Sequence, residues 1–567
     1  MISKSRTSPV HWTALLILAA YTLLLQGYAV SFEEISSGFD SIQSRRIQAT
    51  LQFLASKHFR GRGTGTPEAE LTADYIASVF QRQGLQPPAE NRGAYVQSFD
   101  LVQAVPRKES HLTFELQDKT SVELKMGEDF LPAPWGFDSN EVKGQATFGG
   151  YGISAPELDY DDFAQLIAKD RVVVVLSKFP ASTQPSAWDP FSQKDYEEPM
   201  EKVLQAQKAG ASGVIIVLPS GENVPALSTL TVKNAKTYLA SDVERIRVPA
   251  VFVSYAVGEK LIGANRSRRL ETLKTIQERL DVEMKPVSFA LERTVSMKTV
   301  YDHRFLKGSN VVGIVPGTDS QLRDQYVLLG AHHDHLGSGE NQEIFFGADD
   351  DASGVTGLLE LAEAFQIGPL KPRRSVVLAA WGAEELGLLG SRYYAQRPLF
   401  PLNKTVAMIQ LDMIGRNEQR PADPSNGIEE EKPELNTNTL SVAGSGFSQD
   451  LKKWIEACNQ RVGLTLRYRY DSGQENLLKR SDHWCFLKVG IPSVFFFTGF
   501  HPDYHRPSDT VDKINYEKME KILKLLYLTT WEIADQTHAP RFIDSLPRAK
   551  KSAVATPERA TSGDRER

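Results

Sequence analysis

In YVLLGAHHDH, residues 326–335, an apolar run passes directly into a cluster of histidine and aspartate. Three later runs have the same continuously apolar character: Val376–Ala380, Val406–Leu411 and Val494–Phe497. Continuous apolarity is expected of parallel strands that are buried on both faces. From Asn310 to about Thr537 such runs alternate with helical patterns, which predicts an α/β fold with a mainly parallel sheet flanked by helices.

Metal-binding residue types follow each of the four predicted strands. His332 follows the first strand, Glu384 and Glu385 follow the second, Asp412 follows the third, and His505 lies in the loop after the fourth. Open α/β sheets bind ligands outside the carboxyl ends of their strands, so we expect these side chains to meet at one edge. A fifth element, GADDDASG, opens a strong helical pattern and adds three aspartates to this set.

The residue types in this set match the chemistry of zinc. Imidazole nitrogen and carboxylate oxygen together suit this ion. A carboxylate has two oxygens and can bridge two ions that lie about 3.5–4 Å apart. Such a pair needs one central aspartate, further histidine and acidic ligands on each side, and one acid that stays free as a base. The sequence supplies all of these.

The motifs GAHHDHLG, GADDDASG, WGAEELGLLGS, LDMIGR and YHRPSDT resemble, in the same order, those of the co-catalytic zinc aminopeptidase family. That family includes bacterial leucyl aminopeptidases and, more distantly, glutamate carboxypeptidase. The resemblance covers about Phe32–Val102 and Asn310–Thr537. It implies an exopeptidase that binds two zinc ions and hydrolyses peptides. Cobalt or manganese could replace zinc, since geometry and supply decide metal selectivity.

The resemblance also implies a set of metal ligands. His332 and Asp412 would bind one zinc ion, and Glu385 and His505 would bind the other. Asp350, the middle of the three aspartates, would bridge the two ions.

Three further residues receive catalytic roles from the same resemblance. Glu384 would be the general base, which takes a proton from water and later delivers it to the departing amine. Asp334 would accept a hydrogen bond from the His332 imidazole and fix its orientation. Tyr504 would donate a hydrogen bond to the developing oxyanion.

A region with a different sequence pattern separates the two parts of the chain that carry this resemblance. From about Ser121 to Val295 the sequence shows short strands and one helical segment. Its motifs GGYGISAPELDYDDFA, RVVVVL, KAGASGVIIV and RVPAVFVS resemble a protease-associated domain. We predict a discontinuous zinc peptidase domain, residues 30–120 and 296–540, with a β-rich protease-associated domain inserted at 121–295.

The two ends of the chain are predicted to lie outside these domains. Residues 1–29 combine basic residues, a short apolar run and small residues at Gly27–Ala29, which is typical of a secretory signal peptide. A secreted or periplasmic protein with no membrane span after cleavage is expected, and an uncleaved anchor is the alternative. Residues 541–567 are charged and poor in large apolar groups, which predicts a disordered tail.

Composition excludes some partners and leaves others open. The 567 residues include 65 basic and 71 acidic ones, for a net charge of −6, so no basic field suggests nucleic acid as a partner. The two cysteines, Cys458 and Cys485, fit either one disulfide or two buried thiols. Oligomeric state is not indicated.

Several candidate residues also have purely structural interpretations. Glu384 and Glu385 could be an acidic pair in the first turn of a helix. Asp351 could cap the helix that follows it, and Asp349 is expected to be structural. We expect packing or surface positions, not metal binding, for four other histidines: His303, His333, His335 and His501. For Asp482 a role as the cap of a loop is favoured.

Four functions compete on this pattern. An exported aminopeptidase is favoured. A carboxypeptidase or a peptidase of small conjugates would use the same zinc chemistry, but it needs cations aimed at a terminal carboxylate, for which Arg416, Arg480 and Arg506 are candidates. A receptor-like protein that has lost its metals would lack ligands, and none is missing here. A single-zinc cyclase of similar fold would not need the full bridging set.

Overall fold

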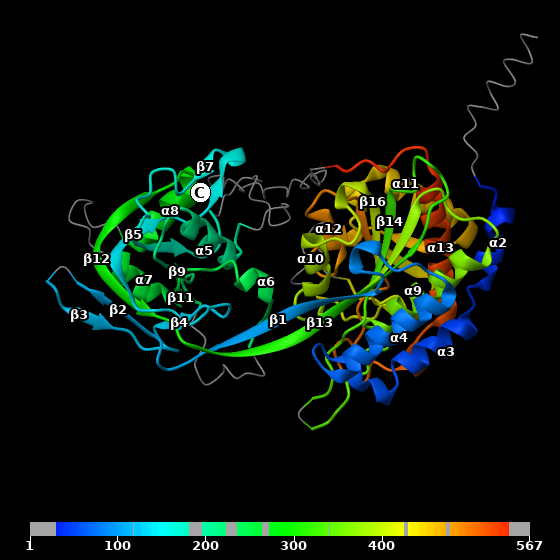
Figure 1. Cartoon of the computed structure of the whole chain (residues 1–567), viewed down its shortest axis with the longest axis horizontal. Coiled ribbons are helices and arrows are strands. Elements are labelled where there is room, and N and C mark those ends of the chain that lie inside the picture. The colour runs from blue at the N-terminus through cyan, green and yellow to red at the C-terminus, as the bar shows by residue number, and fades with distance from the viewer. Residues whose placement is uncertain are drawn as a thin grey trace, which may run out of the picture.

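The computed structural model describes residues 30–543 except 117, 181–195, 223–234, 263–271, 340, 424–428 and 472–476. The predicted signal peptide and residues 544–567 of the predicted tail lie outside the described residues. Two lobes lie side by side, each built around one large sheet (Figure 1). The strands β1 (Val96–Pro106) and β13 (Tyr301–Val315) pair antiparallel and run from one lobe to the other.

The larger lobe contains a nine-stranded sheet with the order β10-β1-β13-β15-β14-β16-β19-β17-β18. Its four central strands are mutually parallel, and β13 and β17 pair antiparallel on either side of them. The predicted parallel centre is therefore confirmed within a mixed sheet. The strands not yet bounded are β14 (Tyr326–His332), β15 (Ser375–Trp381), β16 (Thr405–Leu411), β19 (Ser493–Phe497), β17 (Thr439–Ala443), β18 (Thr465–Arg467) and β10 (Thr237–Leu239).

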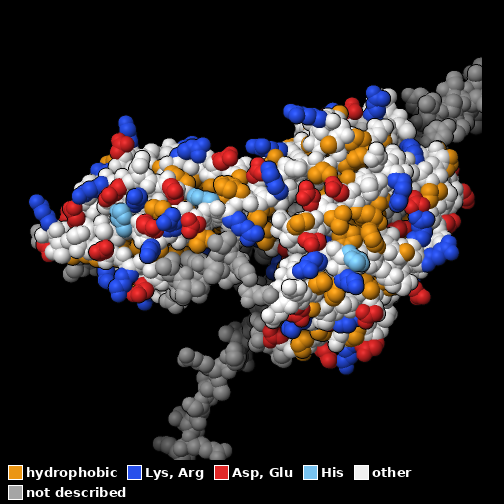
Figure 2. All heavy atoms as spheres, turned by 60° about the horizontal axis from the view of Figure 1, so that its bottom comes forward, with side chains coloured by type: hydrophobic (Ala, Val, Ile, Leu, Met, Phe, Trp, Pro, Cys, Tyr) orange, Lys and Arg blue, Asp and Glu red, His pale blue; other side chains and the backbone are white. Residues whose placement is uncertain are grey.

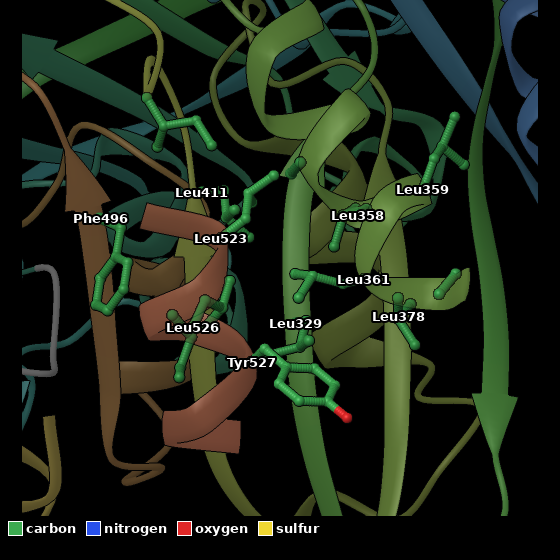
Figure 3. Packing of buried hydrophobic residues seen from close by; sticks show 14 of the residues in the cluster. Leu329, Leu358, Leu359, Leu361, Leu378, Leu411, Phe496, Leu523, Leu526 and Tyr527 are labelled. Atoms are coloured by element: carbon green, nitrogen blue, oxygen red, sulfur yellow. The ribbon is translucent and has the colours of Figure 1, made fainter. Parts of the chain in front are cut away.

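Helices cover both faces of this sheet, which explains why its central strands are apolar throughout. Along β14, Val327 and Leu329 enter one hydrophobic cluster, whereas Leu328 enters the cluster on the opposite face. Successive side chains of a strand point to opposite faces, so both faces must be apolar when both are covered. Figure 3 shows the first cluster between the strands and two helices, α9 (Ala352–Ile367) and α13 (Tyr516–Asp535).

Capping residues set the ends of two helices of this lobe. The Asp351 side chain accepts the backbone N–H of Gly354 and caps α9. The helix α4 (Pro67–Gln83) begins after the cap Thr66 and ends at Gly84, whose φ of 82° suits a glycine cap. The other helices of this lobe are α2 (Phe32–Ser41), α3 (Ser44–Leu54), α10 (Leu389–Gln396), α11 (Gln449–Val462) and α12 (His483–Leu487).

The smaller lobe contains an eight-stranded sheet with the order β3-β2-β12-β5-β8-β9-β11-β4. Its strands are β2 (His111–Glu115), β3 (Ser121–Glu123), β4 (Phe130–Pro132), β5 (Val142–Gly149), β8 (Val172–Leu176), β9 (Gly213–Val217), β11 (Ala250–Val253) and β12 (Ser288–Lys298). Its helices are α5 (Pro199–Lys208), α6 (Ala240–Val243), α7 (Tyr255–Ile262) and α8 (Leu273–Glu283), and a small hairpin joins β6 (Ser154–Ala155) to β7 (Tyr160–Asp161).

This sheet extends beyond the predicted insertion limits of 121–295. The strand β2 lies in the predicted first peptidase segment, and β12 crosses the predicted end of the insertion. These two strands pair with each other, so both belong to the sheet of the smaller lobe. The domain boundaries themselves stay a prediction.

The surface carries charges of both signs. On the face shown in Figure 2, Lys and Arg side chains are interspersed with Asp and Glu side chains over both lobes. Among the described residues, none of the helices has both the length and the apolar character that a bilayer crossing requires.

Both cysteines are free thiols. Burial raises the pKa of Cys458 to about 12 and that of Cys485 to about 11, so both thiols stay protonated near neutral pH.

Candidate metal centre

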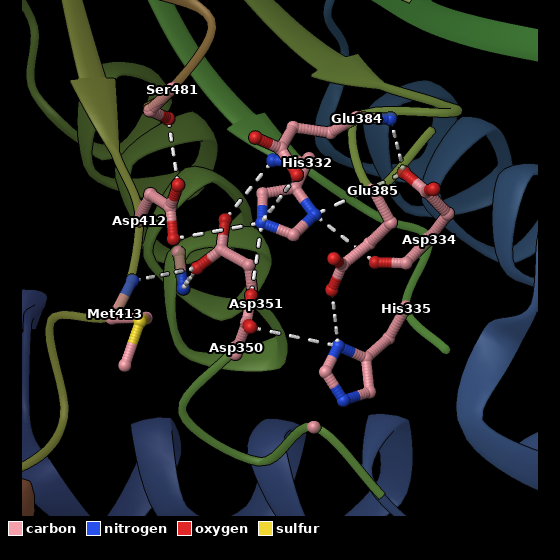
Figure 4. A network of polar contacts seen from close by, with 12 residues as sticks. His332, Asp334, His335, Asp350, Asp351, Glu384, Glu385, Asp412, Met413 and Ser481 are labelled. Carbon is pink, nitrogen blue, oxygen red and sulfur yellow. Dashed lines mark hydrogen bonds and ion pairs between the residues drawn. The ribbon is translucent and has the colours of Figure 1, made fainter. Parts of the chain in front are cut away.

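The predicted ligand-bearing segments leave the nine-stranded sheet at one edge. The strands β15, β14, β16 and β19 are parallel neighbours, so their carboxyl ends lie together. His332 is the last residue of β14, and Asp412 directly follows β16. Glu384 and Glu385 lie in the turn after β15, and His505 lies in the loop after β19. Figure 4 shows most of these side chains pointing toward one another.

The two carboxylate oxygens of Asp350 face two different groups of donors. On one side, Asp350 Oδ1 lies 3.1 Å from His332 Nε2, which is itself 3.5 Å from Asp412 Oδ1. On the other side, Asp350 Oδ2 lies 3.1 Å from His505 Nε2, which is 3.2 Å from Glu385 Oε2. Two ligand atoms of a tetrahedral zinc ion, each about 2.0–2.1 Å from the metal, lie roughly 3.3 Å apart. Both donor groups therefore fit zinc in chemistry and in spacing.

Two groups of side chains in the described residues have ligand atoms that all lie within 4.8 Å of one another. The first is His332, Asp350 and Asp412, and the second is His335, Asp350 and Glu385. His335 had been expected to be a packing or surface residue. The structure instead places its Nδ1 2.7 Å from Glu385 Oε1, with a fully buried side chain.

Burial and the close histidines strongly perturb the acids of the site. Burial raises the pKa of Glu384 well above its usual range, because the charged form loses solvation. Burial acts in the same direction on Asp350, but His335, His332 and His505 outweigh it and hold the pKa of Asp350 well below its usual range. Asp350 is thus an ionised carboxylate, as a bridging ligand must be.

Hydrogen bonds to residues around the site orient the candidate ligands. Ser481 Oγ donates to Asp412 Oδ2 at 2.7 Å, which leaves Oδ1 directed at His332. His332 Nδ1 lies 3.1 Å from the backbone carbonyl of Asp334. This contact fixes the ring so that Nε2 points into the site.

Asp334 makes a different contact from the one expected of it. Its carboxylate lies 3.9 Å from His332 Nδ1, beyond hydrogen-bond distance, and the backbone carbonyl of Asp334 takes that place. The carboxylate instead accepts from the Thr64 hydroxyl at 2.7 Å and from the Glu384 backbone N–H at 3.0 Å. Asp334 therefore supports the turn that carries Glu384, and it lies within the site without orienting the imidazole through its side chain.

Two buried residues that were not predicted for the site hold its loops in place. Arg62 is 1% exposed and donates to the backbone carbonyls of His333, Phe346 and Gly347 at 2.8–3.0 Å. Asp509 Oδ2 accepts the backbone N–H groups of Asp349 and Asp350. In the sequence, Arg62 lies in a glycine-rich stretch and Asp509 lies after the run that forms β19. Neither pattern predicts that the side chain would bind backbone groups of the site.

The positions of the acidic residues relative to the helices show which of them have structural roles. Glu384 and Glu385 precede α10 by several residues, so they are not an acidic pair in a first helical turn. Asp351 is the cap of α9, as expected. Asp349 accepts the backbone N–H of Gly415 and lies 3.3 Å from His501, both buried, which is the expected structural role.

Asp482 does not have the role expected of it, whereas His333 does. Asp482 is fully buried, and its carboxylate accepts from Ser391 and Gln410, so it ties β16 to α10 and does not cap a loop. His333 is buried, with Nε2 2.8 Å from the Ser309 carbonyl, in the packing role expected.

The backbone adopts unusual conformations at three non-glycine positions of the site. Ala383, Met413 and His505 have φ values of 58°, 55° and 55°. Ala383 directly precedes Glu384, Met413 directly follows Asp412, and His505 is itself a candidate ligand. Left-handed backbone at non-glycine residues costs free energy and clusters at functional sites, where the surrounding structure enforces it.

A pocket lies next to the two donor groups. One wall is apolar and comes from Met413, Leu477, Phe495, Phe497 and Phe500. The pocket is also lined by the polar side chains of Glu384, Tyr504 and Arg480 and by the candidate ligands His332, Asp350, Asp412 and His505. The pocket therefore offers apolar contacts directly beside the polar donors.

Comparison with known proteins agrees with this geometry. Residues 310–530 match the model of peptidase family M28, and residues 143–261 match that of the PA domain. The chain is 28% identical over 256 residues to a probable zinc metalloprotease of Pyrenophora tritici-repentis, which covers 41% of this chain and 58% of that protein. It is 27% identical over 252 residues to aminopeptidase YwaD of Bacillus subtilis, covering 43% and 49%. The chain thus spans about half the length of these curated relatives.

Solved structures similar to this chain include the aminopeptidase from Aneurinibacillus sp. strain AM-1. It has a TM-score of 0.47 and 22% identity, and the match covers 91% of this chain and 98% of that one. The family matches lie on the described site: the stretch 310–530 contains all five candidate ligands and ends within α13. Residues 310–530 therefore belong to peptidase family M28, and the PA domain is inserted in the chain ahead of them.

Proposed function

We propose that this chain is an exported two-zinc aminopeptidase, which hydrolyses the first peptide bond of peptides with a free N-terminal amine. The observation that carries the proposal is the arrangement around Asp350, whose two oxygens each lie 3.1 Å from a different histidine nitrogen. A carboxylate shared in this way suits two ions, because each of its oxygens faces a different group of donors. This arrangement argues against the single-zinc cyclase and the metal-free receptor.

The ligands that would hold the two ions are those the sequence proposed. His332 and Asp412 would bind one ion, Glu385 and His505 the other, and Asp350 both. When bound, the zinc ions would supply Lewis acidity, which lowers the pKa of a water molecule and polarises the scissile carbonyl.

Glu384 is the proposed general base. It lines the pocket, and its Oε2 lies 3.9 Å from His332 Nε2, so it is next to the first donor group without belonging to it. Its backbone is fixed by Asp334, so the carboxylate is held beside the reacting bond. In the proposed reaction it accepts a proton from the attacking water and passes that proton to the leaving amine.

Tyr504 is the proposed donor to the oxyanion. It lines the pocket beside Glu384, and its ring stacks on His505 with centroids 3.9 Å apart. A rigid phenol at this distance from the donors can direct its O–H at the carbonyl oxygen as negative charge develops there.

The apolar wall of the pocket favours substrates with a large apolar N-terminal residue. Four aromatic or aliphatic side chains, Phe495, Phe497, Phe500 and Leu477, would contact it and exclude water. We therefore expect leucine or phenylalanine to be preferred over lysine or glutamate at the cleaved end.

The carboxypeptidase alternative rests on cations near the site. Arg416 is engaged, because its Nη2 lies 3.0 Å from Asp503. Arg506 is exposed and does not line the pocket. Arg480 lines the pocket and is the one candidate of the three that favours recognition of a carboxylate.

Two measurements on the full chain test the proposal. Metal analysis of the purified protein should find two divalent ions per chain. Leucine p-nitroanilide with a free amine should be cleaved, and its N-acetylated form should not. Cleavage restricted to acyl peptides with a free C-terminus would replace the aminopeptidase with the carboxypeptidase, and a single bound ion would contradict the site itself.

Export is proposed from the sequence of residues 1–29. N-terminal sequencing of protein recovered outside the cytoplasm should begin close to residue 30. An intact N-terminus in the membrane fraction would support the uncleaved anchor instead.

A further inference from the structure

The two histidines that flank the ligand His332 on its C-terminal side have different surroundings. Both are buried, at 2% exposure. His333 Nε2 contacts the Ser309 carbonyl, away from the donors, whereas His335 Nδ1 contacts Glu385 Oε1 (Figure 4). His335 thus touches a proposed metal ligand, and His333 does not.

The distance between His335 and Glu385 distinguishes a hydrogen bond from shared metal ligation. Nδ1 and Oε1 are 2.7 Å apart, a normal length for a charge-assisted hydrogen bond. The pairs that would share an ion are longer, at 3.1–3.5 Å, close to the roughly 3.3 Å expected of two zinc ligands. An ionised carboxylate can only accept, so the proton of this bond belongs to His335 Nδ1.

The His335 ring is firmly held in this orientation. Its side chain is fully buried, and its backbone N–H donates to the Arg62 carbonyl at 3.2 Å. Gly347 packs against the ring so closely that a Cβ at that position would lie 2.5 Å from His335 Cδ2. The ring therefore cannot swing away from Glu385 without displacing the loop that carries Asp350.

We propose that His335 is a positioning residue for the second metal ion, acting through Glu385. Its Nδ1–H occupies Glu385 Oε1, so that Oε2, 3.2 Å from His505 Nε2, is the oxygen left for the ion. Glu385 would then hold the ion through Oε2 alone. This inference rests on the proposed two-metal function and adds a residue that the expected ligand set did not include.

The test uses the full chain loaded with Co²⁺, whose visible absorption is stronger at low coordination number. In His335→Leu the hydrogen bond is lost, Glu385 can bind through both oxygens, and the absorption of the second Co²⁺ equivalent should fall. Affinity for the second equivalent should weaken roughly 10–100-fold, the usual effect of losing such a partner. In His335→Asn an amide N–H stands near the place of Nδ1, so the wild-type spectrum and affinity should largely return.

Other outcomes are clearly distinguishable. If His335 is itself a ligand, His335→Leu removes a donor, the absorption of the second equivalent rises, and His335→Asn does not rescue it. If His335 is only a packing residue, the matched variant His333→Leu changes the second equivalent as much as His335→Leu does. Either result overturns the proposal. Binding of the first Co²⁺ equivalent at unchanged affinity verifies folding of each variant. A wild-type chain that binds only one Co²⁺ would instead contradict the two-metal function.

Discussion

Arg480 donates a hydrogen bond to Tyr504, with Nη2 3.1 Å from the phenol oxygen. A guanidinium group has donors only, so the oxygen of Tyr504 must accept this bond, and its own proton points elsewhere. Because Tyr504 stacks on His505 and lines the pocket, that proton can be directed at the proposed oxyanion. Arg480 is thus expected to orient the hydroxyl group of Tyr504.

A double-mutant cycle tests this relationship. Tyr504→Phe should lower kcat by roughly 10²–10³, the usual loss for one oxyanion donor, with little change in KM. Arg480→Met should lower kcat by less, because the hydroxyl remains but is no longer oriented. The double variant should be no slower than Tyr504→Phe, since Arg480 acts through the missing hydroxyl.

The matched control is Arg506→Met, which removes an exposed arginine two positions after Tyr504 and should leave kcat unchanged. Independent, multiplicative losses in the double variant would show that Arg480 acts by another route. A rise in KM confined to substrates with a free carboxylate would favour the carboxypeptidase.

The adjacent acids Glu384 and Glu385 should separate base from ligand. Glu384→Gln is expected to keep two ions and lose roughly 10²–10⁴ in kcat, the usual scale for acid–base catalysis. Glu385→Gln is expected to lose the second ion, because its Oε2 is a proposed ligand. Metal content and kcat measured on both variants give the answer. Near-normal turnover of Glu384→Gln with two ions bound would remove Glu384 from the mechanism.

The central sheet was predictable because its strands carry a strong local signal. The cores of β14, β15, β16 and β19 were each predicted within their observed limits. Continuously apolar segments between helical patterns have few other structural solutions. The strands β1 and β13 were not predicted, since much of β13 is solvent-exposed and its polar residues follow no simple period.

Residue types at the site were predictable, but contacts between the backbone and side chains were not. Nothing in GAHHDH distinguishes His335 from His333, because the difference lies in which way the chain turns after β14. Asp334 was expected to use its carboxylate, and a backbone carbonyl took its place. The left-handed backbone at Met413 and His505 is imposed by tertiary structure, for which no local sequence signal exists.

Arg62 should be essential for stability although it touches no substrate. It is buried and donates to carbonyls of two loops that carry His332 and Asp350. Arg62→Met removes the donor to the carbonyls of His333 and Phe346. An unsatisfied buried carbonyl costs about 1–3 kcal/mol, so the free energy of unfolding should fall by at least that amount. Denaturant unfolding of the zinc-free protein measures the loss.

The neighbouring Arg60 provides the control for that substitution. Its side chain is 44% exposed and lies 3.7 Å from Glu68. Arg60→Met should change the free energy of unfolding by less than about 0.5 kcal/mol, since exposed ion pairs contribute little. Equal losses in the two variants would mean that the buried hydrogen bonds of Arg62 are not what stabilises these loops.

Lys202 of the smaller lobe should make stability rise with pH above neutrality. It is 1% exposed, its Nζ donates to the carbonyls of Tyr151 and Lys178, and burial lowers its pKa to about 7. In the unfolded chain a lysine has a pKa of about 10.4. Between these two values the unfolded chain holds a proton that the folded chain does not, so the free energy of unfolding increases with pH, by at most about 1.4 kcal/mol per unit.

Burial raises the pKa of nearby Asp162 to about 7, so this group titrates below the pH range in which Lys202 acts. Its effect on the free energy of unfolding is opposite to that of Lys202, because its contribution falls as the pH rises toward 7. The thermal midpoint of wild type should therefore rise relative to that of Lys202→Met between pH 7 and pH 9. The exposed Lys208 lies on the same helix, and Lys208→Met should stay parallel to wild type across this range. If Lys202→Met also runs parallel, the buried amine keeps its proton in the folded protein, and the two carbonyls compensate for the lost hydration.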